Sequence, residues 1–591
     1  MGQIPGTNRG IITLKKRPIR PFLFSGNELM MANKKNSQII TLIAVFFATL
    51  LASAANSASL SQAGVATAHP LATEIGEKIL KNGGNAFDAA VAITAALAVV
   101  EPYGSGLGGG GFWLIHNAAD GKEIMIDGRE RAPYAAHRDM YLDKDGNVDH
   151  KKSMDGALAA GIPGVPAGLS YLAEAYGLLD LSTSLEPAIH LARDGFKVDE
   201  YFARMVKFRL KALQESKEAS RIFLQNNNVP EVGYVIKQDD LANTLELIAN
   251  KGMEGFYQGE MAGKLVDGVK QAGGIWSLED LLEYQVVPRV PVSSKYKNMK
   301  ITSAALPSSG GIVMAEVFNM LATQDLENKT DTQQKHLIIE ALRRAYRDRA
   351  EYMGDSDYVK VPVKQLISQN YGAQLAADIN PKKATSSALL KPVAFESGGN
   401  NTTHFSVVDR RGNRVAATLS VNYPFGSAHV VPGTGILLND EMDDFSAKPG
   451  VPNAYGLIGA EANAIKPGKR MLSSMSPTFL ELEDRIAVVG TPGGSRIISM
   501  VILAALEFYK GADAKSMVNL PRIHHQYLPD NVFYEKGALS SQTIAELKAM
   551  GHQLKEGDVW GNMHAVIWHK KKKIMDAASD KRGIGKAVII K

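Results

Sequence analysis

The sequence predicts a mixed α/β protein in which helices cover β-sheets. Apolar runs of strand length, at 112–116 and 124–126, occur beside helical patterns, and the helix expected at 86–100 is apolar on most faces. A helix of that kind has to be buried, here against a sheet. A long helical region, 163–370, precedes a second β-rich part that begins near residue 402. With 45% hydrophobic residues, 21% charged residues and 55 glycines, the composition is globular with many tight turns.

Several elements can be assigned from their end signals. Residues 64–67 form a strand pattern, and His69-Pro70 opens a helix that ends at Gly83-Gly84. Asn85 is placed to cap the apolar helix that follows. A further helix is expected over 334–353, with one apolar stripe and with its arginines and acids facing solvent.

The N-terminal 58 residues differ from the rest in charge. They hold seven Lys or Arg against one acid, Glu28, so the total net charge of +5 leaves about −1 for the remainder. No basic surface for nucleic acid is therefore expected. Lys34-Lys35, the apolar run 39–51 and the small residues Ala52-Ser53-Ala54 are typical of a secretory signal, and the run is shorter than the ~20 residues that span a bilayer. We expect residues 1–54 to be an N-terminal extension with a signal peptide, and the mature protein to be periplasmic or secreted without stable membrane insertion.

The chain has no cysteine, which excludes disulfides, thiolate metal sites and a cysteine nucleophile. The glycine-rich run 104–111 matches a dinucleotide-binding pattern only formally, because it precedes a strand instead of following one. Its glycines are expected to let two backbones approach closely. The adjacent pair His524-His525 would point to opposite faces of a strand, so we expect no metal site and no cofactor. Hydroxyl or carboxylate chemistry remains.

A strand pattern follows directly behind an exposed linker. Residues 382–401 are rich in Ser, Ala, Lys and Gly and have little periodicity. From 402 to 408 apolar and polar residues alternate, so that one face packs and the other, with Thr402, His404 and Ser406, faces a site. A turn and a second β-rich run complete a hairpin.

Thr402 stands at the junction of this linker and this strand. A threonine hydroxyl is a poor nucleophile without a base beside it, and one such base is the threonine's own α-amine, freed by cutting the preceding bond. An α-amine titrates near ~7.7 to 8.0, so a useful fraction is neutral at physiological pH. Cleavage before Thr402 would therefore create a nucleophile and its base together.

The stretch Thr402–Asp409 resembles the start of the small subunit in the γ-glutamyltransferase (glutathione hydrolase) family of N-terminal-nucleophile hydrolases. Met-Asp-Asp-Phe, Ser-Ser-Met-Ser-Pro-Thr and Pro-Gly-Gly-Ser-Arg motifs follow in the family's order, and the likeness covers the chain from about residue 61. The resemblance implies a four-layer αββα sandwich and a precursor that cleaves itself. We expect a large subunit, 55–401, and a small catalytic subunit, 402–591, within one globular unit.

The resemblance also implies the site. Thr402 would be the catalytic nucleophile, and Gly493 and Gly494 would form the oxyanion hole, which suits a Gly-Gly turn at a helix start. The residues expected to bind substrate are Arg129, Ser420, Asn422, Glu441, Asp444, Ser473 and Ser474. Arg129 would hold an α-carboxylate, the serine pair would assist it, and the acids would receive an α-ammonium. Ser420 departs from the threonine expected there but keeps the hydroxyl.

Residues 449–469 resemble the lid loop of bacterial members, with Tyr455 as its gating aromatic; an ordinary surface loop is the alternative. The implied activity transfers the γ-glutamyl group of glutathione to water or to amino acid or peptide acceptors, through an ester on Thr402. Two alternatives remain open at this point. One is a cephalosporin acylase on the same scaffold, which takes a glutaryl side chain, and the other is a secreted binding protein that has lost catalysis.

Overall fold

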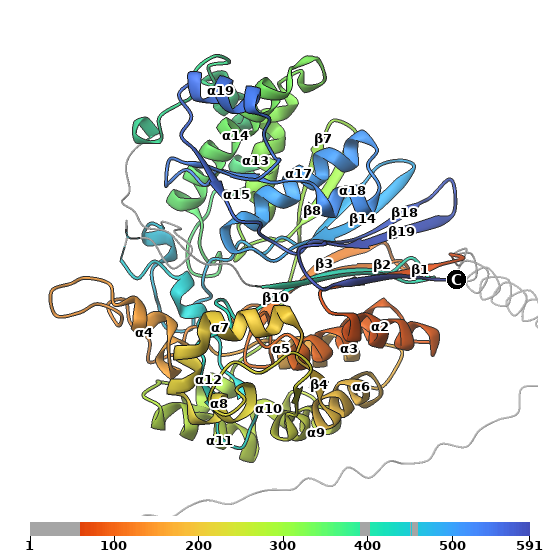
Figure 1. The fold of residues 1–591 in the computed structure, drawn as a ribbon, viewed down its shortest axis with the longest axis vertical. Helices are drawn as coiled ribbons and strands as arrows, with labels where there is room; N and C mark the ends of the chain where they lie inside the picture. Colours follow the sequence, from red (N-terminus) through yellow and green to blue (C-terminus); the bar gives the residue numbers. More distant parts are fainter. Residues whose placement is uncertain (1–59, 391–401, 449–450, 452–458) are drawn as a thin grey trace, which may run out of the picture. The chain divides into compact units, whose positions relative to one another are not determined.

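The computed structural model describes residues 60–390, 402–448, 451 and 459–591. Two antiparallel sheets lie face to face, and helices cover both outer faces (Figure 1). The fold is therefore an αββα sandwich, as predicted. The expected signal peptide lies outside the described residues. Within the described part of the chain, no helix is long and apolar enough to cross a bilayer.

The first sheet has seven strands and combines segments from both ends of the chain. In spatial order these are β20 (Lys586–Ile590), β1 (Ala63–Thr67), β9 (Thr403–Val408), β10 (Arg414–Ser420), β2 (Gly110–Asn117), β3 (Lys122–Gly128) and β6 (Val287–Arg289). The second sheet has six strands: β19 (Ile574–Ser579), β18 (His564–His569), β14 (Arg485–Gly490), β13 (Thr478–Glu481), β8 (Met299–Ser303) and β7 (Val292–Tyr296). The predicted hairpin is β9 and β10, which pair with each other.

Alternation along the strands divides the apolar residues between two cores. On β2, Trp113 and Ile115 pack beneath the first helical layer, whereas Phe112 and Leu114 pack between the two sheets. Successive side chains of a strand point to opposite faces, so a strand inside this sandwich is buried on both sides. The continuous apolar runs of the sequence follow from that position.

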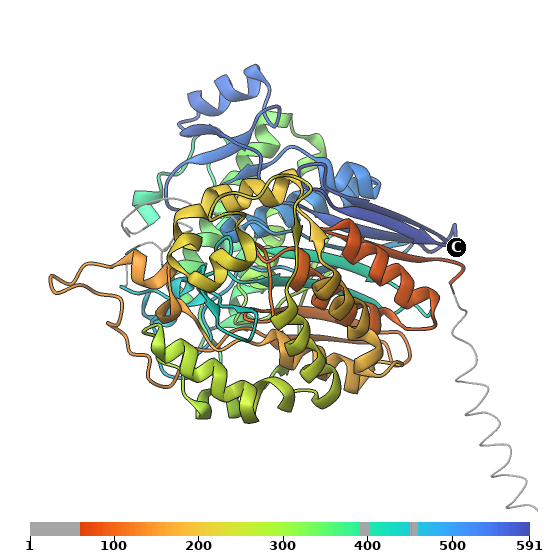
Figure 2. The ribbon, with the colours of Figure 1, turned by 60° about the horizontal axis from the view of Figure 1, so that its bottom comes forward.

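One helical layer covers the first sheet, and Figure 2 brings this layer forward. Its helices are α2 (Pro70–Lys81), α3 (Ala86–Val100), α5 (Val165–Tyr176), α6 (Leu181–Asp194), α7 (Glu200–Glu215), α9 (Asp239–Lys251) and α11 (Gly259–Gln271), with the short α4 (His150–Met154), α8 (Lys217–Phe223), α10 (Glu254–Tyr257) and α12 (Leu278–Leu282). Every residue of α3 is buried. Asn85 caps this helix as predicted, in a capping box with Asp88.

The other helical layer covers the second sheet. It consists of α13 (Gly310–Ala322), α14 (Asp331–Tyr352), α15 (Val363–Leu366), α16 (Gln369–Ala377), α17 (Ile497–Lys510), α18 (Ala514–Asn519) and α19 (Ser541–Ala549). Small sheets complete the fold: β15 (Ile523–His524) with β16 (Val532–Glu535) and β17 (Leu554–Gly557), β4 (Phe196–Lys197) with β5 (Val235–Ile236), and β11 (Val430–Val431) with β12 (Ile436–Leu437).

Two expectations about charged and polar faces were wrong. On α14, Glu340, Arg343 and Arg349 are buried instead of facing solvent. The helix is enclosed by other segments, and most of its charges find partners there, since Glu340 pairs with Arg343. On the predicted polar face of β9, His404 and Ser406 lie between the sheets and not toward a site. His404 hydrogen-bonds to Thr418 and Ser406, which satisfies the polar groups within the core.

The close approach of the two sheets at His404 leads to a first prediction. A Cβ atom added at Gly490 on β14 would lie 2.3 Å from the imidazole of His404, which is fully buried. We expect Gly490→Ala to lower the free energy of unfolding by about 1 to 3 kcal/mol, as overpacked cores do. Denaturant titration measures this change.

Gly263→Ala on α11 is the matched control, because the added Cβ there meets nothing within 4 Å. It should leave stability unchanged or raise it by about 0.4 to 1 kcal/mol. An unfolding midpoint for Gly490→Ala equal to that of the control would contradict the packing described.

Candidate active site

Thr402 lies immediately before β9, in the interior of the first sheet, where β1 and β10 flank that strand. Thr402 is buried, and the adjacent Thr403 donates a hydrogen bond of 2.6 Å to the carboxylate of Glu101. Burial raises the pKa of Glu101 to about 7, against the lowering effect of hydrogen bonds from Thr403 and Tyr103. The start of β9 is thus fixed to the segment that follows α3.

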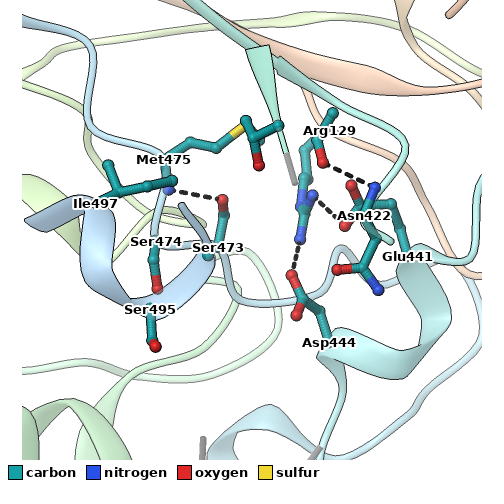
Figure 3. Close-up of a pocket in the computed structure, with 12 residues that line it drawn as sticks. Arg129, Asn422, Glu441, Asp444, Ser473, Ser474, Met475, Ser495 and Ile497 are labelled. Atoms are coloured by element: carbon teal, nitrogen blue, oxygen red, sulfur yellow. Dashed lines mark hydrogen bonds and ion pairs between the residues drawn. The ribbon is translucent and has the colours of Figure 1, made fainter. Parts of the chain in front are cut away.

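Thr402 is one of the residues that line a small pocket. Figure 3 shows this pocket. The pocket is lined by Arg129, Thr402, Ser420, Asn422, Glu441, Asp444, Ser473, Ser474, Met475, Gly494, Ser495 and Ile497. Nine of the residues predicted for the site are among them. Segments separated by hundreds of residues therefore meet around one threonine hydroxyl.

Strand ends and close backbone contacts bring these segments together. Arg129 directly follows β3, and Ser420 is the last residue of β10. Within the glycine-rich run, a Cβ at Gly109 would lie 2.1 Å from the carbonyl oxygen of Ser420, and one at Gly108 would lie 2.0 Å from that of Leu437. Only glycine permits such contacts. The predicted close approach of backbones is confirmed.

Arg129 is the centre of the charged part of the pocket. Its guanidinium is buried and donates to Glu441 at 2.5 Å and to Asp444 at 2.6 Å, with Glu130 farther away at 3.4 Å. Its Nε donates to the carbonyl oxygen of Met471 at 3.3 Å. The predicted carboxylate-binding arginine and ammonium-binding acids are therefore paired with one another.

The acids of this cluster differ from solvent-exposed carboxylates. Burial raises the pKa of Glu441 to about 7, while Arg129 and a hydrogen bond from Ser420 oppose the shift. Burial and the nearby Glu441 raise the pKa of Glu130 well above its usual value. Glu130 therefore keeps its proton to a higher pH than an exposed carboxyl group does, and Glu441, with a pKa of about 7, changes its charge near neutral pH.

Ser473 and Ser474 present hydroxyl groups on the opposite wall. The oxygen of Ser473 accepts a hydrogen bond from the backbone N–H of Met475, and that of Ser474 accepts one from Arg349. A hydroxyl that accepts from the protein keeps its own proton for another acceptor. The pair can therefore donate two hydrogen bonds to an anion in the pocket.

The Gly-Gly turn lies between β14 and α17. Gly493 has a φ of 144° and Gly494 a φ of 55°, a backbone form that favours glycine. Gly494 lines the pocket, and Gly493 is not among the lining residues. Their role as an oxyanion hole remains a prediction from the resemblance.

One predicted residue cannot be placed, and three residues of the pocket were not predicted. Tyr455 lies outside the described residues. Met475, Ser495 and Ile497 line the pocket without having been predicted. Met475 and Ser495 adjoin the serine and glycine pairs, so extending each motif by one residue would have found them. Ile497 carries no such signal, because its position depends on where α17 begins.

A buried group of possible metal ligands was also missed. His336, Glu340 and His552 place one ligand atom each within 4.8 Å of one another. However, His336 Nδ1 and His552 Nε2 are hydrogen-bonded at 2.8 Å, and Arg343 and Arg344 hold the carboxylate of Glu340. A cation would have to displace these contacts beside two guanidinium groups. These hydrogen bonds and ion pairs account for the cluster as a structural one, which links α14 to the segment that contains His552.

A threonine at the start of an interior strand in an αββα sandwich, opening into a charged pocket, defines the class of N-terminal-nucleophile hydrolases. Comparisons agree. The cephalosporin acylase from Bacillus halodurans superposes with a TM-score of 0.79 at 26% identity, covering 90% of this chain and 96% of that one. The γ-glutamyltranspeptidase of Helicobacter pylori superposes with a TM-score of 0.54 at 42% identity, covering 55% of this chain and 93% of that one.

Sequence comparison narrows the class to a family. Residues 72–590 match the family described as gamma-glutamyltranspeptidase. The glutathione hydrolase proenzyme of Pseudomonas sp. (strain A14) is 44% identical over 494 residues, which cover 83% of this chain and 86% of that protein. The chain belongs to the gamma-glutamyltranspeptidase family.

The raised pKa of Glu441 leads to a second prediction. A protonated Glu441 cannot offer a charge to an ammonium group, so binding of free glutamate should tighten as pH rises from about 6 to about 8. The pKa of about 7 places the change in this interval, where glutamate keeps its own ammonium. Calorimetric titration at several pH values measures the dissociation constant.

Glutarate, which lacks the ammonium, is the control ligand and should not gain affinity over the same interval. Glu441→Gln should flatten the glutamate profile, because the amide does not titrate. An unchanged slope in Glu441→Gln would assign the pH dependence to another group.

Proposed function

We infer that this protein is a self-cleaving γ-glutamyltransferase and glutathione hydrolase. It moves the γ-glutamyl group of glutathione and related compounds to water or to amino acid or peptide acceptors. One observation carries this conclusion: Thr402, Arg129 and the acids Glu441 and Asp444 line one small pocket. A hydroxyl nucleophile thus lies beside groups that match the carboxylate and the ammonium of a glutamyl residue.

The proposed chemistry begins with cleavage between Asn401 and Thr402, which frees the α-amine of Thr402. The Thr402 hydroxyl then attacks the γ-amide carbonyl of the substrate while this amine accepts its proton and passes it to the leaving amine. The backbone N–H groups of Gly493 and Gly494 are proposed to stabilise the oxyanion. Water or an acceptor amine then releases the γ-glutamyl group from the threonine ester. Every step uses groups of this chain and its substrates.

Binding would exchange ion pairs instead of creating them. In the structure Arg129 holds both acids, so they have a cationic partner even without an ammonium ligand. A glutamyl residue brings a carboxylate for Arg129 and an ammonium for Glu441 and Asp444. When the substrate breaks the ion pairs between Arg129 and the two acids, its carboxylate pairs with Arg129 and its ammonium pairs with the acids. The buried charges therefore stay balanced.

The subunit boundary is part of the proposal, with a large subunit, 55–401, and a small subunit, 402–591. Both sheets would then contain strands of both subunits, because β9 pairs with β1 and β13 pairs with β8. Separation would unpair strands in both sheets and expose both cores, so the two fragments should stay together. Removal of residues 1–54 and a periplasmic or secreted location belong to the same proposal, supported by the signal-like leader.

The nucleophile provides the third prediction. Purified protein should run as two fragments, whereas Thr402→Ala should remain one chain without activity, because the attacking hydroxyl is gone. Thr402→Ser is the matched control, since it keeps a hydroxyl and should still cleave, although more slowly. Electrophoresis and mass spectrometry of the small fragment measure the outcome. A fragment whose N-terminus is not residue 402 would reject this assignment.

The acylase alternative differs in its substrate, because a glutaryl group carries a carboxylate but no α-ammonium. Such a ligand would take Arg129 from Glu441 and Asp444 and offer them no cation in return. Buried carboxylates without partners are costly. The acid pair therefore favours γ-glutamyl substrates over glutaryl substrates.

The fourth prediction follows from this difference. The enzyme should cleave γ-glutamyl amides much faster than the matching glutaryl amides, and Asp444→Asn should narrow the gap by slowing the former. Loss of one charge-assisted contact corresponds to ~1.5 to 3 kcal/mol, or roughly ten- to hundredfold in kcat/KM. Rates measured with paired anilides test this. Equal rates in the unmodified enzyme would favour the acylase, and no rate on either would favour the inactive binding protein.

A further inference from the structure

A second arginine lies behind the serine wall of the pocket. Arg349 is on the last turn of α14, and its side chain is buried. Its Nε donates to the hydroxyl of Ser309 at 2.9 Å, and its Nη2 donates to that of Ser474 at 3.2 Å. Within the described part of the chain, no carboxylate lies within salt-bridge distance of Arg349. Its hydrogen-bonding partners are neutral.

This arrangement is unusual for a buried cation. The other buried arginines of α14, Arg343 and Arg344, both pair with Glu340. Taking a guanidinium out of water costs several kcal/mol unless an anion compensates for it. Burial lowers the pKa of Arg349, while Tyr346 and Asp444 oppose this shift. An arginine side chain stays protonated in proteins, so the group is charged. The charged guanidinium of Arg349, which has no carboxylate partner, is thus separated from the pocket by the hydroxyl of Ser474.

Arg129 attracts an incoming carboxylate less strongly than an unpaired arginine would, because its charge is already partly neutralised by two acids. That guanidinium already holds Glu441 and Asp444, and its Nε is used by a backbone carbonyl. A carboxylate approaching Arg129 must therefore compete with two anions that are fixed in place. Arg349 has no such competitor in direct contact.

Ser474 connects Arg349 to the pocket. Its oxygen accepts the hydrogen bond from Nη2, and the residue lines the pocket. Because the oxygen accepts from a cation, the hydroxyl proton is free for another acceptor, and the hydrogen bond that it then donates is strengthened. Figure 3 shows Ser474 beside Ser473, on the wall that faces Arg129 and Asp444.

We propose that Arg349 is a specificity-determining positioning residue, whose buried charge acts through the Ser474 hydroxyl to favour substrates with a free α-carboxylate. Arg349 does not touch the substrate in this arrangement. It orients and polarises the hydroxyl that does. The inference rests on the proposed γ-glutamyl function.

The test compares two substrates that differ in one group: a γ-glutamyl anilide with a free α-carboxylate and the same anilide with an α-carboxamide. The measured quantity is the ratio of their kcat/KM values on the self-cleaved enzyme. In Arg349→Met this ratio should fall by roughly tenfold or more, as expected for the loss of one charge-assisted contact, mainly through a higher KM for the carboxylate substrate. Arg349→Lys should restore part of the ratio, because the charge returns.

Arg349→Gln and a double variant guard against a purely structural effect. Glutamine can still donate to Ser474 but carries no charge, so its ratio should fall as in Arg349→Met. If Arg349 acts through Ser474, then Ser474→Ala combined with Arg349→Met should lose no more discrimination than Ser474→Ala alone. Arg347→Met is the control on the same helix, since Arg347 pairs with Asp348 and does not line the pocket. Both substrates should change equally in it.

The outcomes separate the two proposals. An unmodified enzyme that cleaves neither anilide would reject the proposed function itself. An active enzyme in which Arg349→Gln lowers both rates by the same factor would leave the function intact and overturn the role of Arg349. Should Arg349→Met fail to fold, Arg349→Gln and the additivity of Arg349→Gln with Ser474→Ala decide the question alone.

Discussion

The buried ion pairs of Arg129 with Glu441 and Asp444 are the interaction on which the site depends. They join residues 312 and 315 positions apart in the sequence. A buried guanidinium is tolerated only with anions beside it, and buried carboxylates only with a cation. The end of β3 and the acidic turn after β12 are therefore held together before any ligand arrives. The charges of the cluster compensate one another, and the same groups match those that the proposed γ-glutamyl substrate would need.

The sandwich supplies the rigid frame around this cluster. Thr402 begins a strand with neighbours on both sides, and the glycine-rich run permits the backbone contacts that bring β10 and the acidic segment into range. Behind β9, His404 and Ser406 use their polar groups on each other and on the second sheet. The proposed nucleophile is thus positioned by packing and by satisfied hydrogen bonds, which is the support that precise chemistry requires.

Local features were predicted well where neighbouring residues decide them. The limits of α3 agree with the sequence pattern because the capping box of Asn85 and Asp88 is a local interaction. The pairing of β9 with β10 follows from a short turn between two alternating runs. The polar face of β9 was misplaced because alternation shows that two faces differ but not what covers each of them. On α14, Arg343 and Arg349 were placed in solvent for the same reason.

The sequence by itself determined the class of fold, the threonine at the linker–strand junction and, through motifs in order, the family and nine of the residues that line the pocket. Each of these depends on short-range patterns or on residue types that can be recognised in the sequence without the structure. Only the tertiary structure decided which buried charges are neighbours: that Arg129 holds both acids, and that Arg349 stands behind Ser474 without a carboxylate. The physical reason is that ion pairing and desolvation depend on distances of a few ångströms between segments far apart in the chain, and these distances exist only after folding.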